Sequence, residues 1–217
     1  MVVTTPKPLE EILAALGDSR RWVVMGCAEC AAICQTGGSA QVDEMAQALE
    51  ERGMTVLAAV DLPSPCDRRL TRRDLKRIAG ELEQADGIVC LACGGGAQAV
   101  ASLADVPVVV GLDAHFLGTV ERVGRFHEEC AMCGACVINE TGGICPVTRC
   151  PKGLRNGPCE GSRDGACDVH PERACAWEEI HGRLEARGLL EGFEEVRPPL
   201  DPAACARPRS TGGEARR

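Results

Sequence analysis

The spacing of the cysteines constrains what this chain can fold into more than any other feature of its sequence. The chain has 15 cysteines in 217 residues, and most of them fall in short sets. The tightest set is the segment CAMCGAC at positions 130–136, and a second set comprises Cys27, Cys30 and Cys34. Two residues between ligands allow one short turn to present both sulfurs to the same point. The spacing therefore predicts that the chain binds metal ions or clusters.

The first residues give no sign of export or of a membrane span. Segment 1–16 lacks the basic start and the apolar run of a secretory signal. No stretch of the sequence approaches the roughly 18 consecutive apolar residues that a membrane span needs. We therefore expect a cytoplasmic protein, whose cysteines stay reduced and bind metal rather than form disulfides.

The composition argues against two kinds of site. The net charge is −8, whereas a nucleic-acid surface needs basic residues to neutralise phosphates, so we expect no nucleic-acid partner. Aromatic residues make up only 2% of the chain, and flavin and nucleotide rings are usually held between apolar and aromatic walls. If an organic redox cofactor takes part, we therefore expect a partner protein to bind it.

Before residue 126, short apolar runs alternate with helical patterns. The expected strands are 21–26, 54–60, 87–91 and 106–111, and the expected helices are 9–16, 41–52, 72–82 and 97–103. Strands that alternate with helices indicate parallel pairing through right-handed crossovers. We therefore expect an α/β fold, with a Rossmann-like or flavodoxin-like parallel sheet followed by a small cysteine-rich, metal-stapled domain.

Five cysteines are expected at one edge of this sheet. Cys27, Cys66 and Cys93 each follow a strand, and the carboxyl ends of parallel strands form the edge where open α/β sheets carry their sites. Cys30 and Cys34 lie in the loop and first turn after the first of these strands. We expect Cys27, Cys30 and Cys34 to bind one [4Fe–4S] cluster, which needs four thiolates. The fourth ligand is either Cys93 or Cys66, and purely structural cysteines are the alternative.

Segment 126–190 shows no sustained periodicity and is rich in glycine and proline, so it needs metal staples to fold. Its eight cysteines allow two four-thiolate sites. The first comprises Cys130, Cys133, Cys136 and Cys145, and the second comprises Cys150, Cys159, Cys167 and Cys175. The C-x2-C-x2-C run favours [4Fe–4S] at the first site. The second site takes either a cluster or a zinc ion, because both bind tetrahedral sets of thiolates.

Composition also sets the expected domain limits. These are a helix or extension over 1–20, a cluster-binding α/β domain over 21–125, the cysteine-rich domain over 126–190, and a flexible tail over 191–217. We expect Cys90 to be a buried core residue and Cys205 to be a free thiol in the tail. Three basic residues interleave with the thiolates of the cysteine-rich domain and either offset their charge or form a solvated patch: Arg149, Lys152 and Arg155.

Several motifs resemble those of a known family. They are CAMCGAC at 130–136, TGGICP at 141–146, CPKG at 150–153, NGPC at 156–159, GCAECAAICQTGG at 26–38 and CGGGAQ at 93–98. Together they are similar to the small, MetV-type subunit of methylenetetrahydrofolate reductases, over about residues 20–185. Glu160 stands where the family usually has glycine, and His181-Gly182 replaces a usual Tyr-x pair. Both departures are expected to affect local loop geometry or the docking face.

This resemblance implies a role in a complex. In such reductases a large subunit, a flavin-containing TIM barrel, reduces methylene- to methyl-tetrahydrofolate. The present chain would be its non-catalytic iron–sulfur companion, with two [4Fe–4S] clusters that pass electrons to or from the partner's flavin. A further electron donor or acceptor complex would be a second partner. The alternative is a zinc-binding adaptor that docks the reductase to a partner without carrying electrons.

Overall fold

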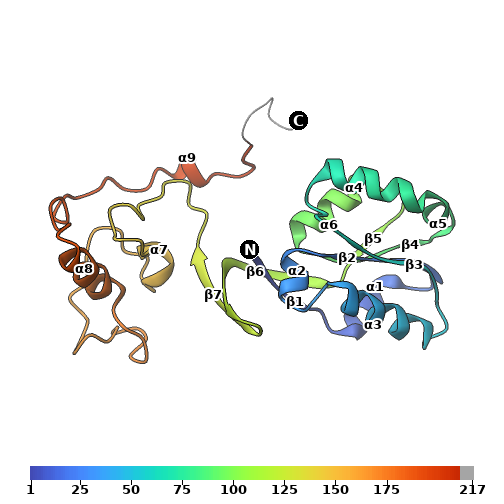
Figure 1. Ribbon diagram of the computed structural model, residues 1–217, viewed down its shortest axis with the longest axis horizontal. Coiled ribbons are helices and arrows are strands. Elements are labelled where there is room, and N and C mark those ends of the chain that lie inside the picture. Colours follow the sequence, from blue (N-terminus) through green and yellow to red (C-terminus); the bar gives the residue numbers. More distant parts are fainter. Residues whose placement is uncertain (211–217) are drawn as a thin grey trace. The chain divides into compact units, whose positions relative to one another are not determined.

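The structure is a computed structural model that describes residues 1–210 (Figure 1). The chain divides into two compact units between His127 and Glu128. We call the segment that ends at His127 unit 1, and the segment that begins at Glu128 unit 2.

Unit 1 contains a four-stranded parallel sheet, which confirms the α/β class expected from the sequence. Its strands are β2 (Arg21–Cys27), β3 (Thr55–Leu62), β4 (Gly87–Leu91) and β5 (Val108–Val110), in the spatial order β3-β2-β4-β5. Each pair of neighbours is parallel. The first strand of this sheet thus lies between the second and the third, which is the flavodoxin-like order.

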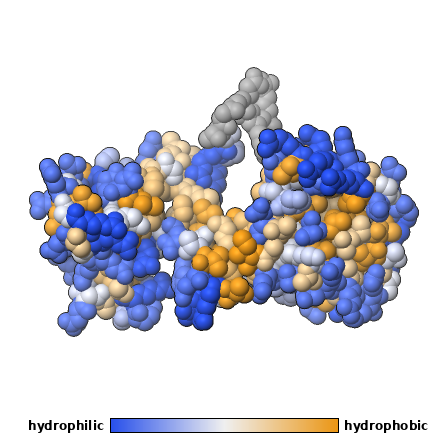
Figure 2. All heavy atoms as spheres, viewed as in Figure 1, coloured by the Kyte–Doolittle hydropathy of each residue, from blue (hydrophilic) through white to orange (hydrophobic). Residues whose placement is uncertain are grey.

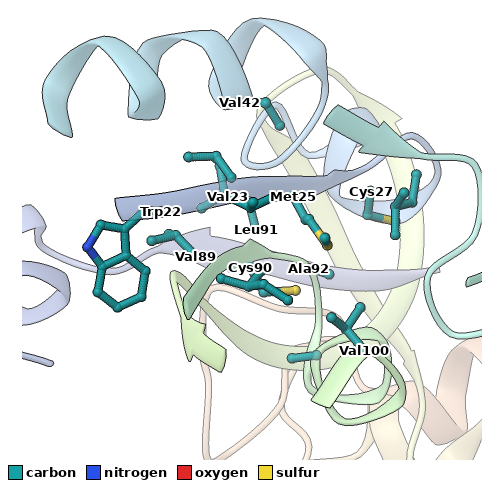
Figure 3. Close-up of a cluster of buried hydrophobic side chains, with 14 of the residues drawn as sticks. Trp22, Val23, Met25, Cys27, Val42, Val89, Cys90, Leu91, Ala92 and Val100 are labelled. Atoms are coloured by element: carbon teal, nitrogen blue, oxygen red, sulfur yellow. The ribbon is translucent and has the colours of Figure 1, made fainter. Parts of the chain in front are cut away.

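The two central strands form because their residues are apolar on both faces. Every residue of β4 is buried, and in β2 only Arg21 is exposed. A parallel sheet that is covered on both faces needs such continuous apolar runs. Figure 3 shows Val23 and Val89 on these strands, with Val42 of helix α3 (Ser39–Glu50) and Val100 of helix α6 (Gly94–Ala101) on opposite sides of them.

Helices cover both faces of the parallel sheet. Figure 1 shows α1 (Leu9–Leu16) and α3 on one face, and α4 (Arg68–Leu75), α5 (Ala79–Gln84) and α6 on the other. The single helix expected over 72–82 is instead two helices joined by the 3-10 turn η1 (Lys76–Ile78). Helix α4 begins earlier than expected because the Asp67 carboxylate caps it by accepting a hydrogen bond from the Arg69 N–H.

A second sheet, whose last strand crosses the boundary between His127 and Glu128, was missed by the sequence analysis. It is antiparallel, and its strands are β1 (Val2–Pro6), β6 (Leu112–Arg122) and β7 (Arg125–Cys130), in the order β1-β6-β7. In β6 only Leu112 and Gly118 are buried, so this strand has no apolar run that would mark it in the sequence. Residues 1–20, which were expected to form a helix or an extension, contain β1 as well as α1.

Unit 2 consists mainly of loops. Its helices are α7 (Pro146–Arg149), α8 (Ala176–Ala186) and α9 (Pro202–Cys205). Its buried apolar cluster comprises Ile144, Trp177, Ile180 and Leu184. Glu160 has a φ of +60°, a left-handed conformation that glycine adopts without strain, so the chain keeps a glycine-like turn at this position. The last part of the expected tail, residues 211–217, lies outside the described residues.

Within residues 1–210, no helix combines the length and the apolar character that crossing a membrane would require.

Candidate metal centres

Cys27 and Cys93 lie where the strand order of the parallel sheet reverses. Cys27 ends β2, and Cys93 directly precedes α6 in the connection that follows β4. The chain leaves the neighbouring strands β2 and β4 in opposite directions, toward β3 and β5, and such a reversal opens a crevice outside the carboxyl ends of the strands. Cys30 begins the short helix α2 (Cys30–Ile33), in the connection that follows β2.

Three sulfurs at this edge influence one another electrostatically. Burial raises the pKa of the Cys27 thiol, and the sulfurs of Cys30 and Cys93 raise it further. The backbone N–H groups of Ala31 and Glu29 donate to the Cys27 sulfur and act in the opposite direction. Once deprotonated, Cys27 would be a buried thiolate whose hydrogen-bond donors are already in place, and this is what a metal-bound sulfur requires.

Two glycines allow the turn after α2 to lie directly against the strands. The Cys27 N–H donates to the Gly37 carbonyl (N···O 2.7 Å), and a Cβ on Gly26 would overlap that same oxygen. A Cβ on Gly37 would overlap the Leu91 carbonyl oxygen. Because no side chain fits at either position, these glycines set the path of the loop that carries the cysteines of α2.

The other cysteines of unit 1 make different contacts. The Cys34 thiol donates to the Val2 carbonyl of β1 (S···O 3.9 Å). Cys66 is exposed, and its sulfur lies 3.5 Å from the Ser64 hydroxyl oxygen. Cys90 is a buried core residue, as expected, and burial raises the pKa of its thiol to about 12. These contacts favour Cys93 over Cys66 as the neighbour of Cys27.

In unit 2, the loop of the first cysteine set is tightly wound. Cys130 ends β7, and its sulfur accepts a hydrogen bond from the Met132 N–H (N···S 3.3 Å). The Cys133 thiol donates to the Ala135 carbonyl (S···O 3.7 Å). Backbone N–H groups that face sulfurs in this way are suited to thiolates, which are strong acceptors.

Cys145 is held near the same strand end. It immediately precedes α7. The Thr148 hydroxyl of α7 donates to the Glu129 carbonyl (O···O 3.1 Å), and Glu129 is the neighbour of Cys130 in β7. This hydrogen bond links α7, which follows Cys145, to β7, which ends at Cys130.

Of the three basic residues expected among the thiolates, Arg155 contacts the loop of this set. Its Nη2 donates to the Ala135 carbonyl (N···O 3.4 Å), the same oxygen that accepts from the Cys133 thiol. Its Nε is buried and has no hydrogen-bond partner. A buried donor without an acceptor is costly, and negative charge bound at this loop would offset that cost. The donor set and this orphaned nitrogen therefore fit a negatively charged thiolate centre.

The second set of unit 2 converges on one small cavity. All four of its cysteines line a cavity of about 20 Å³: Cys150, Cys159, Cys167 and Cys175. This volume is enough for about one water-sized particle. The Lys152 ammonium lies 3.3 Å from the Cys159 sulfur and 2.9 Å from Asp168, and these hydrogen bonds, that to Asp168 foremost, raise the pKa of Lys152. A fixed cation therefore stands beside the cavity.

The structure brings the predicted ligands together only partly. Nowhere in residues 1–210 do three His, Cys, Asp or Glu side chains stand in an arrangement that could hold a metal ion. All 15 cysteines are free, and several thiols hydrogen-bond to carbonyls or to Lys152 instead of facing one another. The assignment of individual cysteines to individual centres thus stays a prediction.

A contact near the first set was missed by the sequence analysis. The segment around α9 packs on the loop of Cys130–Cys136: the Arg209 guanidinium donates to the Met132 carbonyl (N···O 2.7 Å), and a Cβ on Gly134 would overlap the Ala204 carbonyl oxygen. The Cys205 thiol donates to the Pro202 carbonyl (S···O 3.4 Å). The polar, proline-rich composition of this segment hides its packing, because the contacts are made by backbone carbonyls.

The comparison with known families concerns the second half of the chain. Residues 109–203 match the family described as "Methylene-tetrahydrofolate reductase C terminal". No curated protein and no solved structure matches the chain. The matched segment contains all eight cysteines from Cys130 to Cys175. Over this segment, the chain is similar to the C-terminal part of methylenetetrahydrofolate reductases.

Proposed function

We propose that the chain is the iron–sulfur electron-transfer subunit of a methylenetetrahydrofolate reductase complex. It would hold one [4Fe–4S] cluster at Cys27, Cys30, Cys34 and either Cys93 or Cys66, and another at Cys130, Cys133, Cys136 and Cys145. When bound, such clusters supply one-electron chemistry, here to or from the flavin of a catalytic large subunit. The chain itself would be non-catalytic.

The observation that carries this proposal is the overlap between the family match and the cysteines. The matched segment 109–203 encloses two complete sets of four thiols. Thiolates are the protein ligands of iron–sulfur clusters and of structural zinc. A reductase-related segment with two such sets is therefore best explained as a metal-carrying part of a redox complex.

Residues of this chain would position and screen the centres. The N–H groups of Glu29 and Ala31 already donate to the Cys27 sulfur, which stabilises its thiolate form. Arg155 would offset charge beside Cys133, because its Nε lacks an acceptor. Hydrogen bonds and charges around the sulfurs are the means by which a protein sets the reduction potential of a cluster.

The second cysteine set of unit 2 favours a different occupant. A cavity of about 20 Å³ accommodates a single ion, but not the eight atoms of a [4Fe–4S] core without expansion. We therefore propose a mononuclear tetrahedral ion, most simply zinc, at Cys150, Cys159, Cys167 and Cys175. This small cavity is also the observation behind the alternative function, a zinc-binding adaptor that docks the reductase to a partner without carrying electrons.

Metal analysis separates the two functions. The chain is purified anaerobically with a co-expressed large subunit, and iron, zinc and acid-labile sulfide are measured per chain. The proposal predicts about eight irons with matching sulfide, four per cluster, together with about one zinc. It also predicts an EPR signal after reduction with dithionite.

Single substitutions then assign the ligands of unit 1. Cys93→Ser should remove about four irons per chain, whereas Cys66→Ser should retain them. Cys205→Ser is the matched control and should leave the iron content unchanged. Zinc without sulfide in the unsubstituted complex would contradict electron transfer and establish the adaptor.

A further inference from the structure

Unit 1 contains a cleft at the end of the parallel sheet opposite its cysteines. The volume of the cleft is about 460 Å³, which lies within the range of ligand-binding clefts. Leu82 and Glu83 line it shortly before β4, and Leu103 and Val106 line it shortly before β5. The cleft therefore lies at the amino ends of these strands, whereas the predicted metal ligands follow the carboxyl ends. It is separate from the candidate metal centres.

The floor of the cleft is apolar. Leu75 is buried, and Leu82, Leu103 and Val106 are partly buried against the core of unit 1. Figure 2 shows the hydrophilic residues of the α4 region beside a hydrophobic area of unit 1. A cleft with an apolar floor and a few charged groups at its rim is the kind of place where another molecule can bind.

One wall of the cleft belongs to an unusually basic segment, residues 68–77. It carries six arginines and lysines on a chain with a net charge of −8. Three of them already have carboxylate partners within the segment or next to it: Arg69 pairs with Asp67 (2.7 Å), and Arg73 and Arg77 pair with Asp74 (2.8 and 3.4 Å). These two carboxylates compensate only a third of the six positive charges.

The other three cations are exposed and, among the described residues, have no carboxylate within 4.0 Å: Arg68, Arg72 and Lys76. They are spaced four residues apart: Arg68 and Arg72 lie in one row along α4, and Lys76 begins the turn η1 directly after it. Arg72 and Lys76 line the cleft, and Arg68 continues the row beyond it. Among the described residues, Arg72 and Lys76 therefore form no ion pair on their wall of the cleft, and the carboxylates of Glu83 and Asp105 line the same cleft.

We propose that this cleft is the docking site for an amphipathic helix of a partner protein, with acidic residues along one flank. The row of three cations is about 12 Å long, at 1.5 Å per residue, which matches two turns of an acidic helix flank better than one small anion. Apolar residues of that helix would cover the leucines of the floor, as in other helix-in-groove complexes. Glu83 and Asp105 are exposed on the opposite wall of the cleft. Their negative charges would repel a compact polyanion, but they could pair with basic residues on the other flank of a docked helix.

Two synthetic peptides test this assignment on the full chain. They share one helical pattern of leucines and differ only in the flank, which is glutamate in one peptide and lysine in the other. Binding is measured by fluorescence anisotropy at low and at raised salt. The acidic peptide should bind at least about tenfold more tightly than the basic one, and its affinity should fall with salt.

Three variants locate the binding. Arg72→Glu together with Lys76→Glu should lower the affinity of the acidic peptide at least about tenfold. Arg52→Glu together with Arg122→Glu, which removes two exposed cations elsewhere in unit 1, should leave it unchanged. Ala79→Trp, which fills the cleft at an exposed position, should also abolish binding while the charges remain. Circular dichroism checks that each variant is folded.

Several results would overturn the proposal. They are no measurable binding of the acidic peptide, equal affinity for both peptides, or an equal loss in the Arg52/Arg122 variant. Self-association of the chain that disappears in the Arg72/Lys76 variant would show that a second copy, not a partner helix, fills the cleft. None of these readouts depends on a bound metal, so the result is independent of the proposed electron-transfer function.

Discussion

The two units of this chain contain many cysteines but are held together in different ways. Unit 1 has a large apolar core around its parallel sheet, and its cysteines other than Cys90 lie at the edges of that core or in loops. Unit 2 has a buried cluster of four apolar residues and long connections with many residues at positive φ. Unit 1 thus has enough apolar surface to fold on its own, whereas the proposed function implies that unit 2 depends on its metals in order to fold.

The largest expected effect is the loss of a ligand in unit 2. Cys133→Ser should release the metal of its set and open the loops of unit 2, because structural tetrathiolate metal binding is worth on the order of 10 kcal/mol. Hydrogen exchange of the anaerobic complex should show fast exchange between residues 130 and 175. The amides of β2 and β4 should stay protected. Loss of protection in those strands as well would show that the units fold as one.

The apolar clusters provide a matched pair of substitutions. Ile180 and Ile88 are both fully buried, the first in unit 2 and the second in unit 1. Each change to alanine should cost about 2–5 kcal/mol. With metal bound, Ile180→Ala should lower the unfolding midpoint of unit 2 and Ile88→Ala that of unit 1; without metal, only the effect of Ile88→Ala should remain measurable.

Each unit contains one tryptophan that reports on it. Trp22 is buried in unit 1 and Trp177 in unit 2, and the chain has no other tryptophan. Urea unfolding followed by fluorescence, with Trp22→Phe or Trp177→Phe as background, therefore resolves the two transitions. A single shared transition in both backgrounds would contradict the comparison.

At the sheet edge that carries Cys27, we expect iron binding to depend on a glycine as well as on the cysteines. Gly26→Ala should force the turn of Gly37 away from the strand and cost about 1–3 kcal/mol, and it should also reduce iron binding at Cys27, Cys30 and Cys34. Gly95→Ala is the control, because its Cβ would lie 3.9 Å from the Cys93 sulfur, an ordinary contact. Iron content and urea midpoints measure both effects, and equal behaviour of the two variants would exclude this role for Gly26.

The sequence was sufficient for the parts of unit 1 that depend on local pattern. The apolar runs at β2 and β4 identified the strands, and the parallel arrangement then placed Cys27 and Cys93 at one edge. The antiparallel sheet escaped because seven of the eleven residues of β6 are exposed and the strand gains its place by pairing with β1, which is distant in sequence. Pairing of this kind leaves no periodic signal in the strand itself.

Contacts between segments that are distant in sequence were even harder to predict in unit 2. The spacing of the cysteines was enough to predict that the four that line the small cavity belong together, because they lie close in sequence within loops rich in glycine and proline. The packing of Ala204 against Gly134 and the contact of Arg155 with Ala135 depend on how distant loops fold back. No short motif encodes such contacts, so the residues that surround the predicted ligands could be found only in the structure.

The smallest expected effect concerns the charge balance of α4. The Asp74 carboxylate is almost buried and accepts hydrogen bonds from Arg73 (2.8 and 3.1 Å), with Arg77 nearby; the Arg73 hydrogen bonds foremost hold its pKa below the usual 3.8. A depressed folded-state pKa stabilises the fold above the unfolded value, and this stabilisation is lost as the pH falls through the folded-state value.

Asp74→Asn should therefore lower the free energy of unfolding of unit 1 by about 1 kcal/mol at pH 7, and the difference should shrink as the pH falls below about 4. Urea midpoints of the Trp22 transition between pH 7 and pH 3 measure it, with the exposed Asp43→Asn as the control. The substitution also frees Arg73 and Arg77 from their ion pairs with Asp74, so the acidic peptide should bind slightly more tightly to the neighbouring cleft. A pH-independent difference would instead assign the role of Asp74 to packing, and the acid sensitivity of unit 1 would then have to come from other carboxylates.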